Sequence, residues 1–482
     1  MTILRESENC WRIARADQMA VIVDADIYFR LARDAFLKAE RRIMLVGWDF
    51  DARIHLTTEE RLPGEPDSVG EFLYWLVERR PELELYLLRW DVGAIKSLGR
   101  GSTAFTVLKW MRHPRIHTKL DGAHPPAASH HQKIVSIDDA FAFCGGIDMT
   151  GDRWDTRDHR DDDPGRQSPN GAPYMPWHDA TSALAGPVAA MLGELCRERW
   201  KRATGESLAA TTQKGTLWPE SLDPQFCDVD VGIARTFPEL EGCPAAHEIE
   251  TLFIDQIAEA KTTVYMESQY FASRKVAEAI ARRLDEVDGP EIVIINPHTA
   301  QGWLEPIAMD SARARLMEAL HRRDKHGRLK MYHPVTTAGA PIYVHAKITF
   351  IDDRQLRIGS ANLNNRSMRL DSECDVIIDA VQGGEATIKA AITAIRDDLL
   401  AEHLGVMPQE VTKAVAQTGS LIAAVEQLRG EERTLVPYEV PDLSSVEAWL
   451  ADHEVLDPEG PDEIFEPLSA RGLFRRLRKP KR

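Results

Sequence analysis

Two stretches of the chain carry the same pattern of residues, and this repeat constrains the fold more than any other feature. Residues 129–149 read SHHQKIVSIDDAFAFCGGIDM, and residues 343–365 read YVHAKITFIDDRQLRIGSANLNN. Both contain H-x-K-x4-D-x6-G-[GS]-x-[DN] at the same spacing. A chain of 482 residues has room for two domains or one duplicated unit. The repeat favours the duplicated unit.

Helix-like and strand-like segments alternate in the same order before each copy of the motif. In the first half, helical patterns at 27–40 and 71–80 precede apolar strand patterns at 42–51 and 83–91. The second half repeats this order with helical patterns at 247–260, 276–284 and 312–322 and strand patterns at 262–271, 291–297 and 329–335. Strands that are apolar on both faces need helices on both sides of the sheet. The sequence therefore predicts an α/β fold built from a duplicated βα unit around a mixed sheet.

These patterns divide the chain into four predicted parts. We expect an N-terminal lobe at 1–205, a linker at 206–228, a C-terminal lobe at 229–400 and a helical extension at 401–482. The linker is rich in Ser, Thr and Pro. Residues 399–430 read as two or three short helices.

Three segments have compositions of their own. Residues 441–469 carry nine carboxylates and no lysine or arginine, and the tail at 471–482 carries seven basic residues and no acid. Residues 152–176 read as a long polar loop of the kind that often rims a site.

Composition excludes several classes of protein. No uninterrupted apolar stretch is long enough to cross a membrane, and the amino terminus lacks the pattern of a secretory signal, so we expect a cytoplasmic protein. The formal net charge of −17 repels polyanions, which argues against nucleic acid as a partner. The six cysteines form no C-x-x-C pair, which argues against a disulfide framework and a zinc site; they lie at Cys10, Cys144, Cys196, Cys227, Cys243 and Cys374.

The motif spacing itself suggests a chemistry. Residues two apart in a strand point to the same side, so His131 projects with Lys133, and His345 projects with Lys347. If the two halves pair about a pseudo-two-fold axis, both sets meet in one site between the lobes. Two lysines can bind the oxygens of a phosphodiester while one imidazole attacks phosphorus and the other protonates the leaving group. Such a site needs no metal or other cofactor, and the chain contains no H-E-x-x-H, EF-hand or P-loop motif.

Shared ancestry alone is the competing explanation of the repeat. It does not account for polar residues kept at positions beside a strand, where packing favours apolar ones.

The paired motifs resemble the H-x-K-x4-D signatures of the phospholipase D superfamily. YVHAKITFIDDRQLRIGSANLNNRSM resembles the second motif of true phospholipases D, and GGIDMTGDRWD resembles the end of their first motif. Three further segments also resemble sequence segments of these enzymes: MESQYF at 266–271, PWHDATSALAGPVAAML at 176–192 and LLAEHLG at 399–405. The resemblance runs from about residue 20 to residue 405.

The resemblance implies a duplicated α/β sandwich of two pseudo-two-fold-related lobes and a covalent phosphohistidine intermediate. It assigns His131 as nucleophile, His345 as general acid and base, and Lys133 and Lys347 as phosphate-binding lysines. The residues matched to the phosphate pocket are Ser360, Asn362, Gly145 and Gly146.

Carboxylates complete the set that the resemblance implies. By position, Asp179 is assigned to His131 and Glu373 to His345 as the groups that orient the imidazoles. Asp138 and Asp352 are expected to brace the motif turns and to take no part in the chemistry. The first copy departs from the second at Asp148, where the second has Asn362, and Ser268 replaces an Asn of the family word.

The expected activity is that of a phospholipase D, which hydrolyses the distal phosphodiester of glycerophospholipids to phosphatidic acid. Water or a small alcohol would accept the phosphatidyl group, so transfer to alcohols is the expected side reaction. The alternatives are a phosphatidyltransferase of the cardiolipin synthase kind, a nucleic-acid phosphodiesterase, and a binding protein with a dead site. The last is disfavoured because all four histidine and lysine residues are present.

The expected partner is a phospholipid membrane surface, reached by a monomer through peripheral association. In the tail RGLFRRLRKPKR, basic residues surround three apolar ones, a composition that suits an anionic membrane surface. A solvated, disordered end is the alternative interpretation, and the acidic stretch at 441–469 is an alternative partner for the tail.

Overall fold

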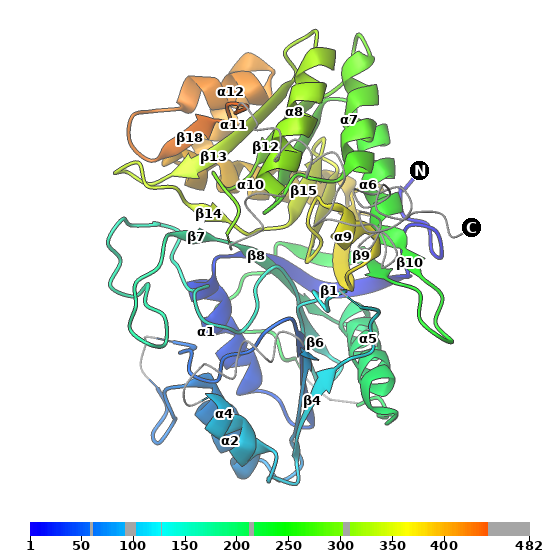
Figure 1. Cartoon of the computed structure of the whole chain (residues 1–482), viewed down its shortest axis with the longest axis vertical. Coiled ribbons are helices and arrows are strands. Elements are labelled where there is room, and N and C mark those ends of the chain that lie inside the picture. The colour runs from blue at the N-terminus through cyan, green and yellow to red at the C-terminus, as the bar shows by residue number, and fades with distance from the viewer. Residues whose placement is uncertain (58–60, 92–102, 127, 212–215, 302–308, 442–482) are drawn as a thin grey trace, which may run out of the picture.

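The structure is a computed structural model that describes residues 1–57, 61–91, 103–126, 128–211, 216–301 and 309–441. The predicted basic tail, and the predicted acidic stretch beyond its first residue, lie outside these ranges. Figure 1 shows the N-terminal half in blue to blue-green and the C-terminal half in green to orange, one on either side of a shared middle.

Within the described residues, sixteen strands form one sheet that runs through both halves. The N-terminal half contributes β1 (Arg12–Val23), β2 (Arg42–Gly47), β3 (Glu84–Trp90), β4 (Ile116–Asp121), β5 (Ile134–Ile137), β6 (Phe141–Gly145) and β8 (Ala180–Ala185). Counted outward from the middle of the sheet, their order is β1, β8, β6, β5, β2, β3 and β4. The first five pair antiparallel, and β2, β3 and β4 pair parallel.

The C-terminal half repeats this arrangement strand for strand. Its strands are β9 (Phe226–Phe237), β11 (Thr263–Glu267), β12 (Glu291–Ile295), β13 (Leu329–Val335), β15 (Ile348–Ile351), β16 (Gln355–Gly359), β17 (Glu373–Asp379) and the additional edge strand β18 (Thr434–Pro437). From the middle outward the order is β9, β17, β16, β15, β11, β12 and β13, with β18 beyond β13 and the short β10 (Ala246–His247) beside β9. The two halves join where β1 and β9 pair antiparallel.

Helices cover both faces of the sheet, as strands buried on both faces require. One face packs against α5 (Pro187–Thr204) and against α10 (Glu385–Leu404), α11 (Pro408–Thr418) and α12 (Leu421–Leu428), in a core continuous across both halves. The other face has a core in each half. The N-terminal one includes α1 (Ala25–Phe36), α2 (Val69–Arg79) and α4 (Thr103–Trp110), and the C-terminal one includes α6 (Glu248–Glu259), α7 (Arg274–Asp285), α8 (Ser311–Arg323) and α9 (Asn365–Arg369).

The predicted alternation of helices and strands is confirmed in both halves. For example, the helix expected at 247–260 is α6, and the strand expected at 329–335 is β13. The sequence reading missed β1 and β9, the two strands that join the halves. Since β9 begins at Phe226, the first strand of the C-terminal half begins just before the expected linker ends. The expected boundary after residue 400 falls within α10.

A second, two-stranded sheet also crosses between the halves. It consists of β7 (Trp177–His178) and β14 (Tyr343–Val344), which pair in parallel. In addition, the backbone N–H of His345 donates to the carbonyl oxygen of His178 at 2.7 Å. These contacts bring the segment that follows the polar loop of the first half against the start of the second motif.

No helix within the described residues is both long enough and apolar enough to cross a membrane.

Candidate active site

A cleft of about 520 Å³ is lined by residues of both halves. Both motif histidines face it: His131 precedes β5 of the N-terminal half, and His345 precedes β15 of the C-terminal half. The meeting of the two imidazoles in one place is the arrangement that the motif spacing predicts.

His131 is held by a carboxylate of the C-terminal half. Its Nδ1 lies 3.0 Å from Oε1 and 3.1 Å from Oε2 of Glu373, and 3.1 Å from the carbonyl oxygen of Ser360. Glu373 is itself fixed by the hydroxyls of Ser360 and Ser367, which donate to it at 2.5 Å and 2.7 Å. The imidazole is thus oriented through Nδ1, and Nε2 is the ring nitrogen left for substrate.

His345 is held in the same way by a carboxylate of the N-terminal half. Its Nδ1 lies 2.6 Å from Oδ2 of Asp179, which is fully buried. The ring of Trp177 lies over the imidazole at a centroid distance of 5.2 Å. His345 is more enclosed than His131, with 6% of its side chain exposed against 16%.

These contacts reverse the predicted pairing of carboxylates and histidines. Asp179 orients His345, and Glu373 orients His131, so each imidazole is braced by the opposite half. The backbone explains the exchange. The β7–β14 pair places Asp179 beside His345, and the backbone N–H of His131 donates to the carbonyl oxygen of Ser372 at 2.9 Å, which places Glu373 beside His131.

The environment keeps both imidazoles neutral at pH 7 when no substrate is bound. Burial, together with the positive charges of Lys133 and Lys347, holds the pKa of each histidine well below its usual value. Burial also raises the pKa of Glu373 to about 8, against the attraction of Lys133. A neutral imidazole has a free lone pair, so this electrostatic arrangement suits a nucleophile.

Neither motif lysine lines the cleft itself, but the ammonium group of each contacts a residue that does. Nζ of Lys133 forms an ion pair with Asp148 at 3.2 Å, whereas Nζ of Lys347 donates to the amide oxygen of Gln269 at 3.4 Å. Burial and the nearby Lys133 lower the pKa of Lys347 to about 7, although Asp179 opposes the shift. Lys347 is therefore a cation that titrates in the physiological range.

The residues matched to the phosphate pocket take different places. Asn362 lines the cleft, and its buried Oδ1 accepts no hydrogen bond from the described residues. Ser360 contacts Glu373 and does not line the cleft. A side chain at Gly145 would overlap Thr181, and one at Gly146 would overlap Asp179. The two glycines thus allow the close approach that places Asp179.

The two motif aspartates contact backbone at the starts of neighbouring strands. Asp138 accepts hydrogen bonds from the backbone N–H groups of residues 40–42, which lead into β2. Asp352 accepts from those of residues 261–263, which lead into β11. Both aspartates have positive φ, of 53° and 52°, so the two turns match as the two halves do.

Several cleft residues lie outside the set picked from the sequence. Gln269 and Tyr270 belong to the segment MESQYF, and Trp177 belongs to PWHD. The resemblance covers both segments but assigns no role to these three residues. Arg153 comes from the polar loop and lies over the ring of Trp177 at 4.4 Å. The predicted loop therefore does reach the rim of the cleft.

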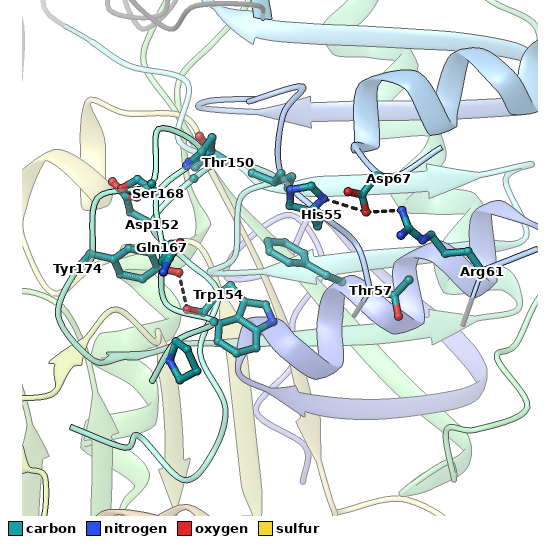
Figure 2. Close-up of a pocket in the computed structure, with 17 residues that line it drawn as sticks. His55, Thr57, Arg61, Asp67, Thr150, Asp152, Trp154, Gln167, Ser168 and Tyr174 are labelled. Carbon is teal, nitrogen blue, oxygen red and sulfur yellow. Dashed lines mark hydrogen bonds and ion pairs between the residues drawn. The ribbon is translucent and has the colours of Figure 1, made fainter. Parts of the chain in front are cut away.

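A second cavity, of about 530 Å³, lies in the N-terminal half beside the same loop (Figure 2). Its polar side chains pair with one another: His55 and Arg61 both contact Asp67, and the hydroxyl of Tyr174 donates to the carbonyl oxygen of Trp154. None of the motif histidines or lysines lines it, so it offers none of the predicted catalytic groups.

Within the described residues, the histidine and carboxylate atoms close enough to share a metal ion are grouped around His178, and none of these residues lines the cleft.

A family model described as "Cardiolipin synthase, PLD-like domain" matches residues 253–392. Phospholipase D A of Dictyostelium discoideum is 24% identical over 83% of this chain and 37% of its own length. Phospholipase D alpha 1 of Carica papaya is 23% identical over 78% of this chain and 63% of its own length. The chain thus spans 37% to 63% of the length of these two relatives.

Among solved structures, phosphatidylserine synthase of Haemophilus influenzae Rd KW20 is similar with a TM-score of 0.53 and 13% sequence identity. The match covers 79% of this chain and 86% of the other. This likeness shows a shared α/β fold.

Proposed function

We propose that this chain, which belongs to the phospholipase D superfamily, is a phospholipase D acting on glycerophospholipids. It cleaves the distal phosphodiester to phosphatidic acid and a free head group, and it transfers the phosphatidyl group to small alcohols when they compete with water. One observation carries the proposal: His131 and His345, each held by a carboxylate of the opposite half, face one cleft.

In the first step, Nε2 of His131 attacks phosphorus, and the bond from phosphorus to the head-group oxygen breaks. His345 donates its proton to that oxygen, so the head group leaves as a neutral alcohol. Binding of the anionic phosphodiester raises the pKa of His345, because the negative charge of the substrate offsets the lysine charges that lower it. His345 can then take up this proton from solvent before it donates it.

In the second step, His345 removes a proton from water, and the resulting oxygen attacks the phosphohistidine. The bond from phosphorus to Nε2 of His131 breaks, which releases phosphatidic acid and restores both imidazoles. An alcohol that replaces water gives a phosphatidyl alcohol by the same route. Lys133 and Lys347 stabilise the charge on the phosphoryl oxygens in both transition states.

The composition of the cleft supports a lipid in preference to a polyanion. Among the mostly polar side chains that line it stand four large apolar ones, Trp48, Trp90, Trp177 and Met309. The net charge of −17 repels nucleic acid over long distances. Since both imidazoles come from one chain, the proposed enzyme acts as a monomer, and it reaches its substrate by peripheral contact with a membrane surface.

The second candidate is a phosphatidyltransferase of the cardiolipin synthase kind. The description of the matching family model, which names cardiolipin synthase, favours it. The chemistry would be the same, with a lipid hydroxyl in place of water.

One experiment separates these reactions. The purified protein is incubated with vesicles of phosphatidylcholine, phosphatidylethanolamine and phosphatidylglycerol, with and without ethanol, and the products are identified by mass spectrometry. We expect phosphatidic acid without ethanol and phosphatidylethanol with it. Cardiolipin as the main product would favour the second candidate. No lipid product, with cleavage of single-stranded DNA in a parallel reaction, would contradict both.

A further inference from the structure

Beside the cleft, on the other side of β7, lies a cluster of buried histidines and carboxylates that the proposed reaction does not use. Its inner members are Asp24 after β1, His159 in the polar loop, His178 in β7 and Glu402 in the last turn of α10. Their side chains are at most 2% exposed. Three come from the N-terminal half, and Glu402 comes from the C-terminal half.

One potential ligand atom from each of the four side chains lies within 4.8 Å of the other three. His178 Nδ1 lies 2.8 Å from Glu402 Oε1 and 3.4 Å from Asp24 Oδ1. His159 Nε2 lies 3.1 Å from the same Glu402 oxygen and 3.4 Å from Asp24 Oδ2. In a tetrahedral zinc site with bonds of about 2.0–2.1 Å, neighbouring ligand atoms are about 3.3–3.4 Å apart. The two distances to Asp24 match that value, whereas the two distances to Glu402 are shorter and in the range of hydrogen bonds.

An unpartnered atom marks the centre independently. Oδ2 of Asp24 makes no hydrogen bond within the described residues, although the residue is fully buried. The nearby Nε2 of His159 approaches it at 3.4 Å without forming a hydrogen bond. A buried carboxylate oxygen that accepts no hydrogen bond is costly, and a metal ion between these atoms would satisfy it.

The outer nitrogens of both imidazoles are already occupied by carboxylates. His159 Nδ1 lies 3.0 Å from Oδ2 of Asp155, and His178 Nε2 lies 2.8 Å from Oε2 of Glu267. A histidine that binds a metal usually donates its other N–H to a carboxylate, which fixes the tautomer and turns the free nitrogen toward the ion. Both histidines of the cluster have this arrangement.

Charge balance allows one alternative. Without an ion, burial lowers the pKa of His159, but Asp24, Asp155 and Glu402 outweigh it and raise the value to about 9. Glu267 and Glu402 likewise outweigh burial and raise the pKa of His178. Two imidazolium protons then supply the two positive charges that a divalent cation would supply to neutral imidazoles. The alternatives are thus a metal ion or two extra protons.

We propose that Asp24, His159, His178 and Glu402 bind one structural divalent transition-metal ion, most simply Zn²⁺. Two imidazole nitrogens and two carboxylate oxygens form a closed tetrahedral set, which leaves no open position for substrate. Other divalent cations that accept nitrogen ligands, such as Co²⁺, fit the same set.

The ion ties the two halves together at a point that matters for the cleft. His178 is directly followed by Asp179, the carboxylate that orients His345, and its carbonyl oxygen accepts from the backbone N–H of His345. Glu402 anchors the other side from α10. The proposed reaction itself needs no metal, so the ion acts on stability and on the placement of Asp179.

The test is the metal content and thermal stability of the full-length protein. Protein purified without added metal is analysed by inductively coupled plasma mass spectrometry, and we expect about one ion per chain. Protein refolded in a chelator should melt at a lower temperature and recover when Zn²⁺ or Co²⁺ is added, because a ligand that binds the folded state stabilises it. The Co²⁺ form should show the intense visible absorption of tetrahedral cobalt.

Two variants locate the ion. Asp24→Asn keeps the shape of the side chain and removes its negative charge, and His159→Gln removes a second ligand. Each should lower metal affinity at least about tenfold. His333→Gln, which alters a partly buried imidazole that contacts His298 and is not among the four proposed ligands, is the matched control and should keep the ion.

Wild-type protein that contains no ion, and whose melting temperature does not respond to Zn²⁺ or Co²⁺ after refolding, would overturn the proposal in favour of the protonated network. Metal content unchanged in both ligand variants would overturn the assignment to this cluster. If a variant does not fold, the wild-type measurements decide, since they need no substitution.

Discussion

The two motifs have matching strand pairs and matching turns but different electrostatic surroundings. In the first motif, Lys133 is paired with the carboxylate of Asp148, and His131 is the more exposed of the two histidines. In the second, Lys347 meets the neutral amide of Gln269, and His345 lies beneath Trp177 beside a single buried aspartate. Duplication thus produced two similar half-sites, and the residues around them made the half-sites unequal.

This inequality supports a division of labour in the proposed reaction. The more exposed His131 suits the nucleophile, which must reach phosphorus. The more enclosed His345 suits the group that exchanges protons with the leaving oxygen and with water. The following predictions test the inequality, starting with the largest effect.

Replacement of either histidine should abolish most of the activity. We expect His131→Ala and His345→Ala each to lower kcat by roughly 10⁴ or more, because each removes a group that takes part in bond making. Steady-state hydrolysis of phosphatidylcholine measures the loss, and circular dichroism checks the fold. Near-normal activity in either variant would contradict the mechanism.

The same variants distinguish the two roles. With a phosphodiester that has a good leaving group, His345→Ala should still form a phosphohistidine at residue 131, since no acid is then needed. Acid-labile phosphate located by mass spectrometry at residue 345 of the wild-type protein would reverse the assignment.

The exchanged carboxylates should show their pairing in double variants. Asp179→Asn and Glu373→Gln should each lower kcat by up to about 10⁴, the range for a carboxylate that orients a catalytic imidazole. In double-mutant cycles, Asp179→Asn should cause little further loss of kcat when combined with His345→Ala, but its full loss of kcat when combined with His131→Ala.

Glu373→Gln should show the opposite pattern. It should cause little further loss of kcat when combined with His131→Ala, and its full loss of kcat when combined with His345→Ala. Equal coupling of both carboxylates to both histidines would contradict the cross-half arrangement.

Loss of a lysine should cost less than loss of a histidine. Lys133→Ala and Lys347→Ala should each lower kcat/KM by roughly 10² to 10³, the range for one transition-state charge contact. Lys389→Ala, on the surface of α10 in a pair with Glu385, is the control and should leave the rate unchanged. A loss below tenfold in both motif variants would remove the lysines from the proposed site.

The smallest predicted effect concerns pH. Because the pKa of Lys347 is about 7, this lysine is charged below pH 7 and loses its charge as the pH rises through that value. We therefore expect kcat/KM to fall on the alkaline side of about pH 7. In Lys347→Arg, whose side chain stays charged, the ratio of activity at pH 8.5 to that at pH 6.5 should be several-fold higher than in the wild type. An unchanged pH profile would mean that the fall in kcat/KM at alkaline pH is due to another titrating group.

Much of the fold could be predicted because the relevant signals are local. The alternation of apolar periodicities located strands such as β13 and helices such as α6, and the repeated motif indicated two related halves. The central strands β1 and β9 escaped notice. Their N-terminal parts mix buried and exposed residues, so they lack a continuous apolar run.

The identity of the motif residues was determined by the sequence alone, because identical spacing in two copies puts each histidine and its lysine on one side of a strand. Which carboxylate serves which histidine was decided only by the tertiary structure. Positions along the chain suggested that each acid acts within its own half, but hydrogen bonds between β7 and β14 carry Asp179 across to His345.

The buried cluster around His178 depends even more on tertiary structure. Asp24, His159 and Glu402 have no common spacing in the sequence, and no local pattern marks them. They meet because β1, the polar loop and α10 converge behind β7, and burial turns scattered polar side chains into one network. Local periodicity can indicate which residues form a strand, whereas contacts between distant segments exist only once the sheet has formed across both halves.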